Sequence, residues 1–266
     1  MDILLPHGLA TLPAWLGIAI TIAVPVAIAL LLGRVMYTLF THAEFQANAV
    51  VGAVKYGFVV EIYAVVAALT LVGAWDTFQT ARDTLQKEAS GLYMLALAVD
   101  TFDGPRLEAT RHEMRGAIRA YAASVVAQDW PAMQAGLPST ASDAAFQRMT
   151  RAFLDADGER SAQQVLQQKT GDWLGQVAEA RIARLSVQSR TLSGLIWMLV
   201  LTVSVAVIAF QWFFGGASAA MHYAMAAVIA VIVGSVLLVS VKLAFPYVGD
   251  PALLTPAPFL AMMDLR

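Results

Sequence analysis

The chain has 266 residues, of which 59% are hydrophobic and only 14% are charged, and its mean hydropathy is +0.65. These values exclude an ordinary soluble domain and favour a protein whose solvent is a lipid bilayer. The net charge of −2 argues against a nucleic-acid partner, which requires clustered positive charge. The absence of cysteine excludes disulfides and thiolate chemistry.

The charges are concentrated in the middle of the chain. Residues 76–190 hold 13 of the 17 Lys and Arg residues and 14 of the 19 Asp and Glu residues. Because charges are costly at the bilayer centre, this pattern predicts a membrane unit interrupted by a water-facing one. We expect an all-α integral membrane protein with four transmembrane helices. Its parts are a first transmembrane hairpin (1–75), a helical extramembrane domain (76–190), a second transmembrane hairpin (191–245) and a C-terminal tail (246–266).

The first hairpin begins with an apolar run over residues 14–33, which is long enough to cross a hydrocarbon core of about 30 Å. A cleaved signal peptide is the competing interpretation, but no basic region precedes the run. The second span covers residues 50–75 and carries Lys55 and Glu61. Either residue is a candidate to line an aqueous path. The alternative is that Lys55 reaches the interface and Glu61 bonds to a neighbouring helix.

The second hairpin consists of spans over residues 191–214 and 221–245. The third span ends in aromatic residues typical of an interfacial belt, namely Trp212, Phe213 and Phe214. In the fourth span, three small residues recur at every fourth position: Ala226, Ala230 and Gly234. They predict close packing against another helix, either within one subunit or between subunits.

The middle region is amphipathic and contains no pattern typical of strands, so it predicts four helices, continuous at both ends with membrane spans. The first helix has an apolar stripe that Glu88 interrupts, and Arg82 lies nearby. We expect a salt bridge from Glu88 to Arg181 or Arg184, which lie at a similar distance from the membrane. The alternative is a solvated charged face, since surface ion pairs are common and weak.

Two signals for membrane orientation disagree. Cations near the spans are more numerous on the side of the middle region, which favours a cytoplasmic location for it. The first span has no Lys or Arg before it and Arg34 after it, which favours an outside N-terminus. We choose the cytoplasmic middle region, in the inner membrane of a bacterium.

No catalytic, metal or cofactor motif is present in the sequence. The four histidines are isolated from one another and from carboxylate clusters at ligand spacing. Phosphate loops, nucleophile elbows and zinc-protease signatures are also absent. We therefore expect no metal, no cofactor and no enzymatic activity.

Four segments resemble a bacterial bestrophin-like family of unknown function. They are WDTFQTARDTLQKEASGL (75–92), AIRAYAASVVAQDWPAM (117–133), EARIARLSVQSR (179–190) and KLAFPYVGD (242–250). The chain departs from the family at residues 244–249, where a charged pair followed by Pro-Phe-Ser-Gly is expected. The family is similar in architecture to bestrophins, which are pentameric anion or cation channels with four spans per subunit.

This resemblance implies a homo-oligomeric channel, a pentamer by analogy, which lies in membrane lipid and passes ions. It also implies that the second span lines the pore. Three residues spaced four apart, Phe58, Ile62 and Val66, are then candidates for an apolar constriction that gates by dewetting. The alternative is that they face lipid or pack against other helices. The rival function is a non-conducting membrane scaffold or sensor whose helical insert binds a partner through an apolar groove.

Overall fold

The computed structural model describes residues 4–101, 107–155, 161–187, 192–215, 218–249 and 252–264, and these ranges contain helices, turns and loops but no strand. The chain divides into two compact units. The first unit is made of residues 1–77, 191–245 and 249–251, and the second of residues 78–190, 246–248 and 252–266.

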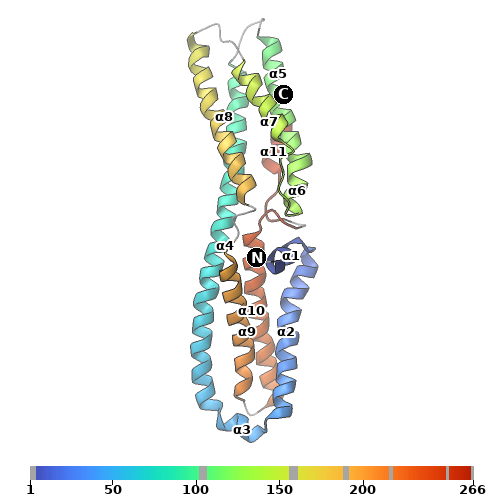
Figure 1. Ribbon diagram of the computed structural model, residues 1–266, viewed down its shortest axis with the longest axis vertical. Helices are drawn as coiled ribbons and strands as arrows, with labels where there is room; N and C mark the ends of the chain where they lie inside the picture. Colours follow the sequence, from blue (N-terminus) through green and yellow to red (C-terminus); the bar gives the residue numbers. More distant parts are fainter. Residues whose placement is uncertain are drawn as a thin grey trace. The chain divides into compact units, whose positions relative to one another are not determined.

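The helices of the first unit are labelled in Figure 1. They are α1 (Leu4–Thr11), α2 (Ala14–Leu39), α3 (His42–Ala47), the first half of α4 (Ala49–Val99), α9 (Gly194–Phe210) and α10 (Ala219–Ala244). Within the described ranges, four helices are long and apolar enough to cross a membrane, namely α2, α4, α9 and α10. The prediction of an all-helical chain with four candidate spans is therefore confirmed for the described residues.

One face of each long helix forms the core of the first unit. Ala29 of α2, Tyr63 of α4, Val207 of α9 and Val233 of α10 are buried together. The aliphatic side chains on the opposite faces remain exposed on the chain, which is the arrangement expected for helices that have lipid or other subunits as neighbours.

The small residues of α10 pack against α2 within the same chain. Ala226, Ala230 and Gly234 are all buried. A Cβ atom added to Gly234 would lie 2.2 Å from the carbonyl oxygen of Thr21, so only glycine allows the two backbones to approach this closely. Of the two partners left open by the sequence, the structure shows the intramolecular one.

The structure places Trp212, one of the three aromatic residues predicted as an interfacial belt, in the interior of the first unit. Its side chain is fully buried between α2 and α10, with its ring 5.1 Å from that of Tyr223 and 6.2 Å from that of Tyr37. Its neighbour Phe213 is exposed. Trp212 is buried because Gly33 of α2 leaves room for its indole ring.

The second unit contains the rest of α4, α5 (Glu108–Ser124), α6 (Trp130–Gln134), α7 (Asp143–Leu154), α8 (Ser161–Val187) and α11 (Ala257–Met263). A π-helical turn, Val125–Asp129, joins α5 to α6. The stripe predicted on α4 contributes Leu85, Leu92 and Val99 to one apolar core.

The C-terminal tail belongs to the core of the second unit. Phe259 of α11 is fully buried there, and α11 packs against α5. The hydroxyl of Tyr247 donates a 2.9 Å hydrogen bond to the carbonyl oxygen of Ala81. Residues 246–248 and 252–264 thus fold with the middle region, although the third and fourth spans lie between them in the sequence.

The two ends of the middle region differ in their connection to the spans. As expected, α4 runs without interruption from Ala49 to Val99. The expectation of a continuous helix at the other end is wrong, because α8 ends at Val187 and α9 begins at Gly194. Ser193 caps α9, where its Oγ accepts a 3.3 Å hydrogen bond from the backbone N–H of Leu195, and a cap of this kind marks a new helix start.

Candidate functional site

The first candidate site is the outer face of α4 between Ala49 and Trp75, which no other part of the first unit covers among the described residues. Val54, Phe58 and Leu69 are exposed on this face, whereas Tyr63 and Ala67 on the opposite face are buried in the core. We call this exposed row the outer stripe of α4. A channel subunit needs such a face, because its pore lining is not covered by its own chain.

The three predicted pore residues lie at different positions relative to the outer stripe. Phe58 is 65% exposed and Ile62 is 43% exposed, whereas Val66 is partly buried. A step of four residues overshoots one helical turn by about 40°, so Val66 has rotated about 80° away from Phe58 and toward the core.

The outer stripe also contains Val65 and Leu69, which are absent from the sequence-based candidates. Val65 and Leu69 are 60% and 68% exposed, and they follow Phe58 at spacings of seven and eleven. These spacings stay within about 20° of one line on a helix of 3.6 residues per turn. A strict helical periodicity would have identified them in the sequence, whereas a spacing of four does not.

Lys55 and Glu61 are both exposed and border the outer stripe on opposite sides. Relative to Phe58, Lys55 is rotated by about 60° in one direction and Glu61 by about 60° in the other. Among the described residues, no ion pair involves either side chain. The structure therefore does not bring these two candidates together.

The second candidate site is a buried charge cluster in the second unit. The Nε atom of Arg184 donates a 2.7 Å hydrogen bond to Oε2 of Glu88, and its Nη2 atom lies 3.2 Å from Oε1. The same Nη2 atom lies 3.3 Å from Oδ2 of Asp129. The hydroxyl of Tyr121 donates a hydrogen bond to Glu88. All four side chains are fully buried.

Asp129 is a member of this cluster that the sequence analysis missed. Its Oδ1 atom accepts a 2.7 Å hydrogen bond from the hydroxyl of Ser139, and its Oδ2 atom accepts one of 2.6 Å from the hydroxyl of Ser142. Asp129 closes the π-helical turn, a local feature that single-sequence patterns do not reveal.

The surroundings of the cluster determine its protonation. Burial raises the pKa of Tyr121 well above its ordinary value, and the negative charge of Glu88 adds to this effect, so Tyr121 stays a neutral donor. Burial alone would raise the pKa of Asp129, but hydrogen bonds from Ser142 and Ser139 and the charge of Arg184 lower it overall. Because no atom of the cluster is open to solvent, we interpret it as a structural joint between α4, the π-helical turn and α8.

The other two ion-pair candidates lie outside this cluster. Arg181 is buried next to it, where its Nη2 atom donates a 3.0 Å hydrogen bond to the hydroxyl of Ser142 and pairs with Asp143. Arg82 is exposed on α4. The structure thus joins Glu88 with Arg184, connects Arg181 through Ser142 and leaves Arg82 on the solvated face.

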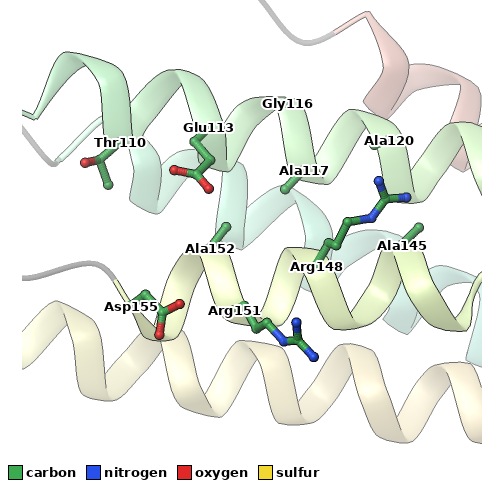
Figure 2. A pocket seen from close by; sticks show the side chains of 10 residues that line it. All are labelled: Thr110, Glu113, Gly116, Ala117, Ala120, Ala145, Arg148, Arg151, Ala152 and Asp155. Carbon is green, nitrogen blue, oxygen red and sulfur yellow. The ribbon is translucent and has the colours of Figure 1, made fainter.

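A groove of about 560 Å³ runs between α5 and α7 on the second unit. Figure 2 shows Glu113 and Asp155 toward one end and Arg148 toward the other, with Arg151 between them. The floor consists of small residues, namely Gly116, Ala117, Ala120, Ala145 and Ala152. The groove therefore combines charge of both signs with a lining of small side chains. Across the described residues, no group of three or more His, Asp or Glu side chains is placed to hold a metal ion.

Several solved structures have a fold similar to that of this chain. Two structures of a bacterial bestrophin homologue from Klebsiella pneumoniae, each with a point mutation, share 11% identity with this chain and cover 93% of it. The first superposes with a TM-score of 0.70 over 95% of that chain, and the second with 0.66 over 96%. A crystal structure of a mutated membrane protein, also 11% identical, gives a TM-score of 0.69. At this identity the likeness shows the fold alone.

Curated proteins give no match to the sequence. The profile of the Bestrophin-like domain, in contrast, matches residues 19–257, which is most of the chain. The match includes most of the first span, the other three spans, the outer stripe of α4 and the buried charge cluster. This chain is therefore a membrane protein that belongs to the Bestrophin-like domain family.

Proposed function

We propose that the protein is an ion channel, that it assembles as a homo-oligomer, and that the outer stripe of α4 lines its pore. The observation that carries this proposal is the exposure of a row of large apolar side chains together with Glu61 on one face of a span. A face that met only lipid would not hold a carboxylate in the middle of the membrane. The family and the fold support the same function.

The narrowest part of the proposed pore is formed by Phe58, Ile62 and Val65. Apolar side chains of this size can close a path by excluding water from it, and small displacements of the helices would then open it. Val66 lies at the edge of this surface, where it packs beside its own subunit. We take five subunits as the working stoichiometry, by analogy with bestrophins.

The channel proposal is tested in planar bilayers with purified protein. The chain has no cysteine, so single-cysteine variants can be modified at one position only. We expect current from the unmodified protein, and we expect a charged thiol reagent to block the Phe58→Cys variant. Val228→Cys is the matched control, because Val228 is exposed to a similar degree on α10. Absence of current at all voltages, or a block that is equal in both variants, would refute the proposal.

We also propose that the second unit is an extramembrane domain on the cytoplasmic side of a bacterial inner membrane. The tail and the middle region belong to the same compact unit, so a reporter fused after Arg266 reports on both. We expect activity from a reporter that works in the cytoplasm. Activity restricted to a periplasmic reporter would reverse the orientation.

The rival function, a non-conducting scaffold or sensor, rests on the groove between α5 and α7. That function predicted an apolar docking groove, whereas the floor of this groove is made of alanines and a glycine and its walls carry charge. No large apolar side chain lines this groove, whereas a partner helix that docks by its apolar face would need such side chains to contact. The channel is therefore the function that the geometry supports better.

A further inference from the structure

In the sequence, the first, third and fourth spans contain no carboxylate. Glu61 is the only one in residues 49–75, which form the membrane part of the second span. It lies twelve residues after the start of α4, which corresponds to about 18 Å along the helix axis. A hydrocarbon core is about 30 Å thick, so this position is close to the middle of the bilayer. The short side chain of glutamate cannot reach either interface from there.

Lys55 does not neutralise this carboxylate within one chain. The two side chains lie about 120° apart around α4, and Lys55 is about 9 Å nearer the start of the helix. Helical side chains tilt toward the N-terminus, so the long stem of Lys55 carries its ammonium group toward the interface. Glu61 therefore lies on an exposed face, and among the described residues it makes no ion pair with a cation of its own chain.

A closed ring of identical subunits repeats every side chain around one axis. If the outer stripe of α4 faces that axis, the copies of Glu61 form a ring of carboxylates at one depth. Rings of Asp or Glu side chains favour cations and repel anions in narrow aqueous paths. We infer that Glu61 is a cation-binding site that makes the pore selective for monovalent metal cations over anions. This inference rests on the proposed channel function.

The neighbours of Glu61 indicate how such a cation is held. The residues one turn before and after it on the outer stripe, Phe58 and Val65, are apolar and offer no oxygen ligand. A cation at the ring therefore keeps most of its water and is attracted by charge, not by a fitted cage. Selection by charge alone predicts similar permeability for Na⁺ and K⁺.

The test is the permeability ratio of K⁺ to Cl⁻, measured from the reversal potential of purified protein in planar bilayers with unequal KCl on the two sides. We expect the unmodified channel to prefer K⁺. We expect Glu61→Gln, which keeps the shape but removes the charge, to lower the ratio by about tenfold. Glu61→Asp should keep the preference, and Lys55→Gln should not lower it.

The outcomes separate this inference from the channel proposal. A conducting protein that prefers Cl⁻, or a Glu61→Gln variant with an unchanged ratio, overturns the inference and leaves the channel intact. A protein without current removes both. Native mass spectrometry shows whether each variant assembles, and if Glu61→Gln does not, a preference of the unmodified channel for Cl⁻ still overturns the inference.

Discussion

At the residue scale, the guanidinium of Arg184 holds two buried carboxylates, those of Glu88 and Asp129. Burying charge is costly unless every partner is present, so such a cluster contributes to the stability of the fold only when it is complete. The hydroxyls of Tyr121, Ser139 and Ser142 supply further donors. The cluster therefore makes the relative placement of α4 and α8 within the second unit sensitive to single substitutions.

Replacing Arg184 tests this role. We expect Arg184→Met to lower the free energy of unfolding by about 3–5 kcal/mol, because it leaves both carboxylates buried without a cation. Thermal unfolding in detergent, followed by circular dichroism, measures the effect. Arg82→Met is the control, since exposed Arg82 should change stability by less than about 0.5 kcal/mol. Equal melting temperatures for the two variants would contradict the structural role.

The same cluster gives a dependence on pH. The pKa of Asp129 is lowered from its ordinary value of 3.8, so the unfolded chain takes up the proton first as the pH falls. The stabilisation is present above pH 3.8 and is lost as the pH falls through the folded pKa. We expect Asp129→Asn to be less stable than the parent at neutral pH and the difference to narrow below pH 3.8. The melting temperatures of the two proteins at a series of pH values measure this difference. A difference that stays constant from neutral pH to below pH 3.8 would refute the prediction.

At the element scale, close helix packing in the first unit depends on where α10 crosses α2. Gly234 faces the backbone of Thr21 directly, so no side chain can be added without moving a helix. The spacing of small residues predicts such a crossing, because small side chains allow close approach. The spacing alone does not identify the partner, because any helix in any subunit could supply it.

We therefore expect Gly234→Ala to destabilise the protein by about 1–3 kcal/mol, although alanine is the better helix former. The melting temperature in detergent and the yield of monodisperse protein report the effect. Gly175→Ala on α8 is the control, because a Cβ atom there meets no other atom within 4 Å. It should be neutral or stabilising, and a loss of stability as large as that of Gly234→Ala would argue against the packing explanation.

The second span shows how a helix can be predicted correctly and its exposed face only in part. Length and hydropathy locate α4, and the amphipathic stripe predicts its continuation to Val99. Phe58 and Ile62 lie on the exposed side, whereas Val66 turns toward the core. All residues in this segment are similarly apolar, so only the packing of the other helices shows which of them remain uncovered.

At the scale of the whole molecule, the exposed apolar surface of the long helices is the surface expected of a protein that lies in a bilayer. The proposed channel adds contacts with other subunits. We expect the protein to stay in the membrane fraction after alkaline carbonate washing. In native mass spectrometry from detergent we expect a mass five times that of the 28.5 kDa chain. A different multiple would change the stoichiometry alone. A monomer would count against the channel, because one α4 cannot enclose a path.

The sequence by itself determined the class of protein, its four spans and its polar middle region, because hydropathy, run length and charge distribution belong to the residues and not to their contacts. Only the tertiary structure decided that Arg184 and not Arg181 pairs with Glu88, that Asp129 joins them, and that Phe259 of the tail completes the second core. These contacts join segments that are distant along the chain. Their formation depends on how helices pack, which local periodicity does not record.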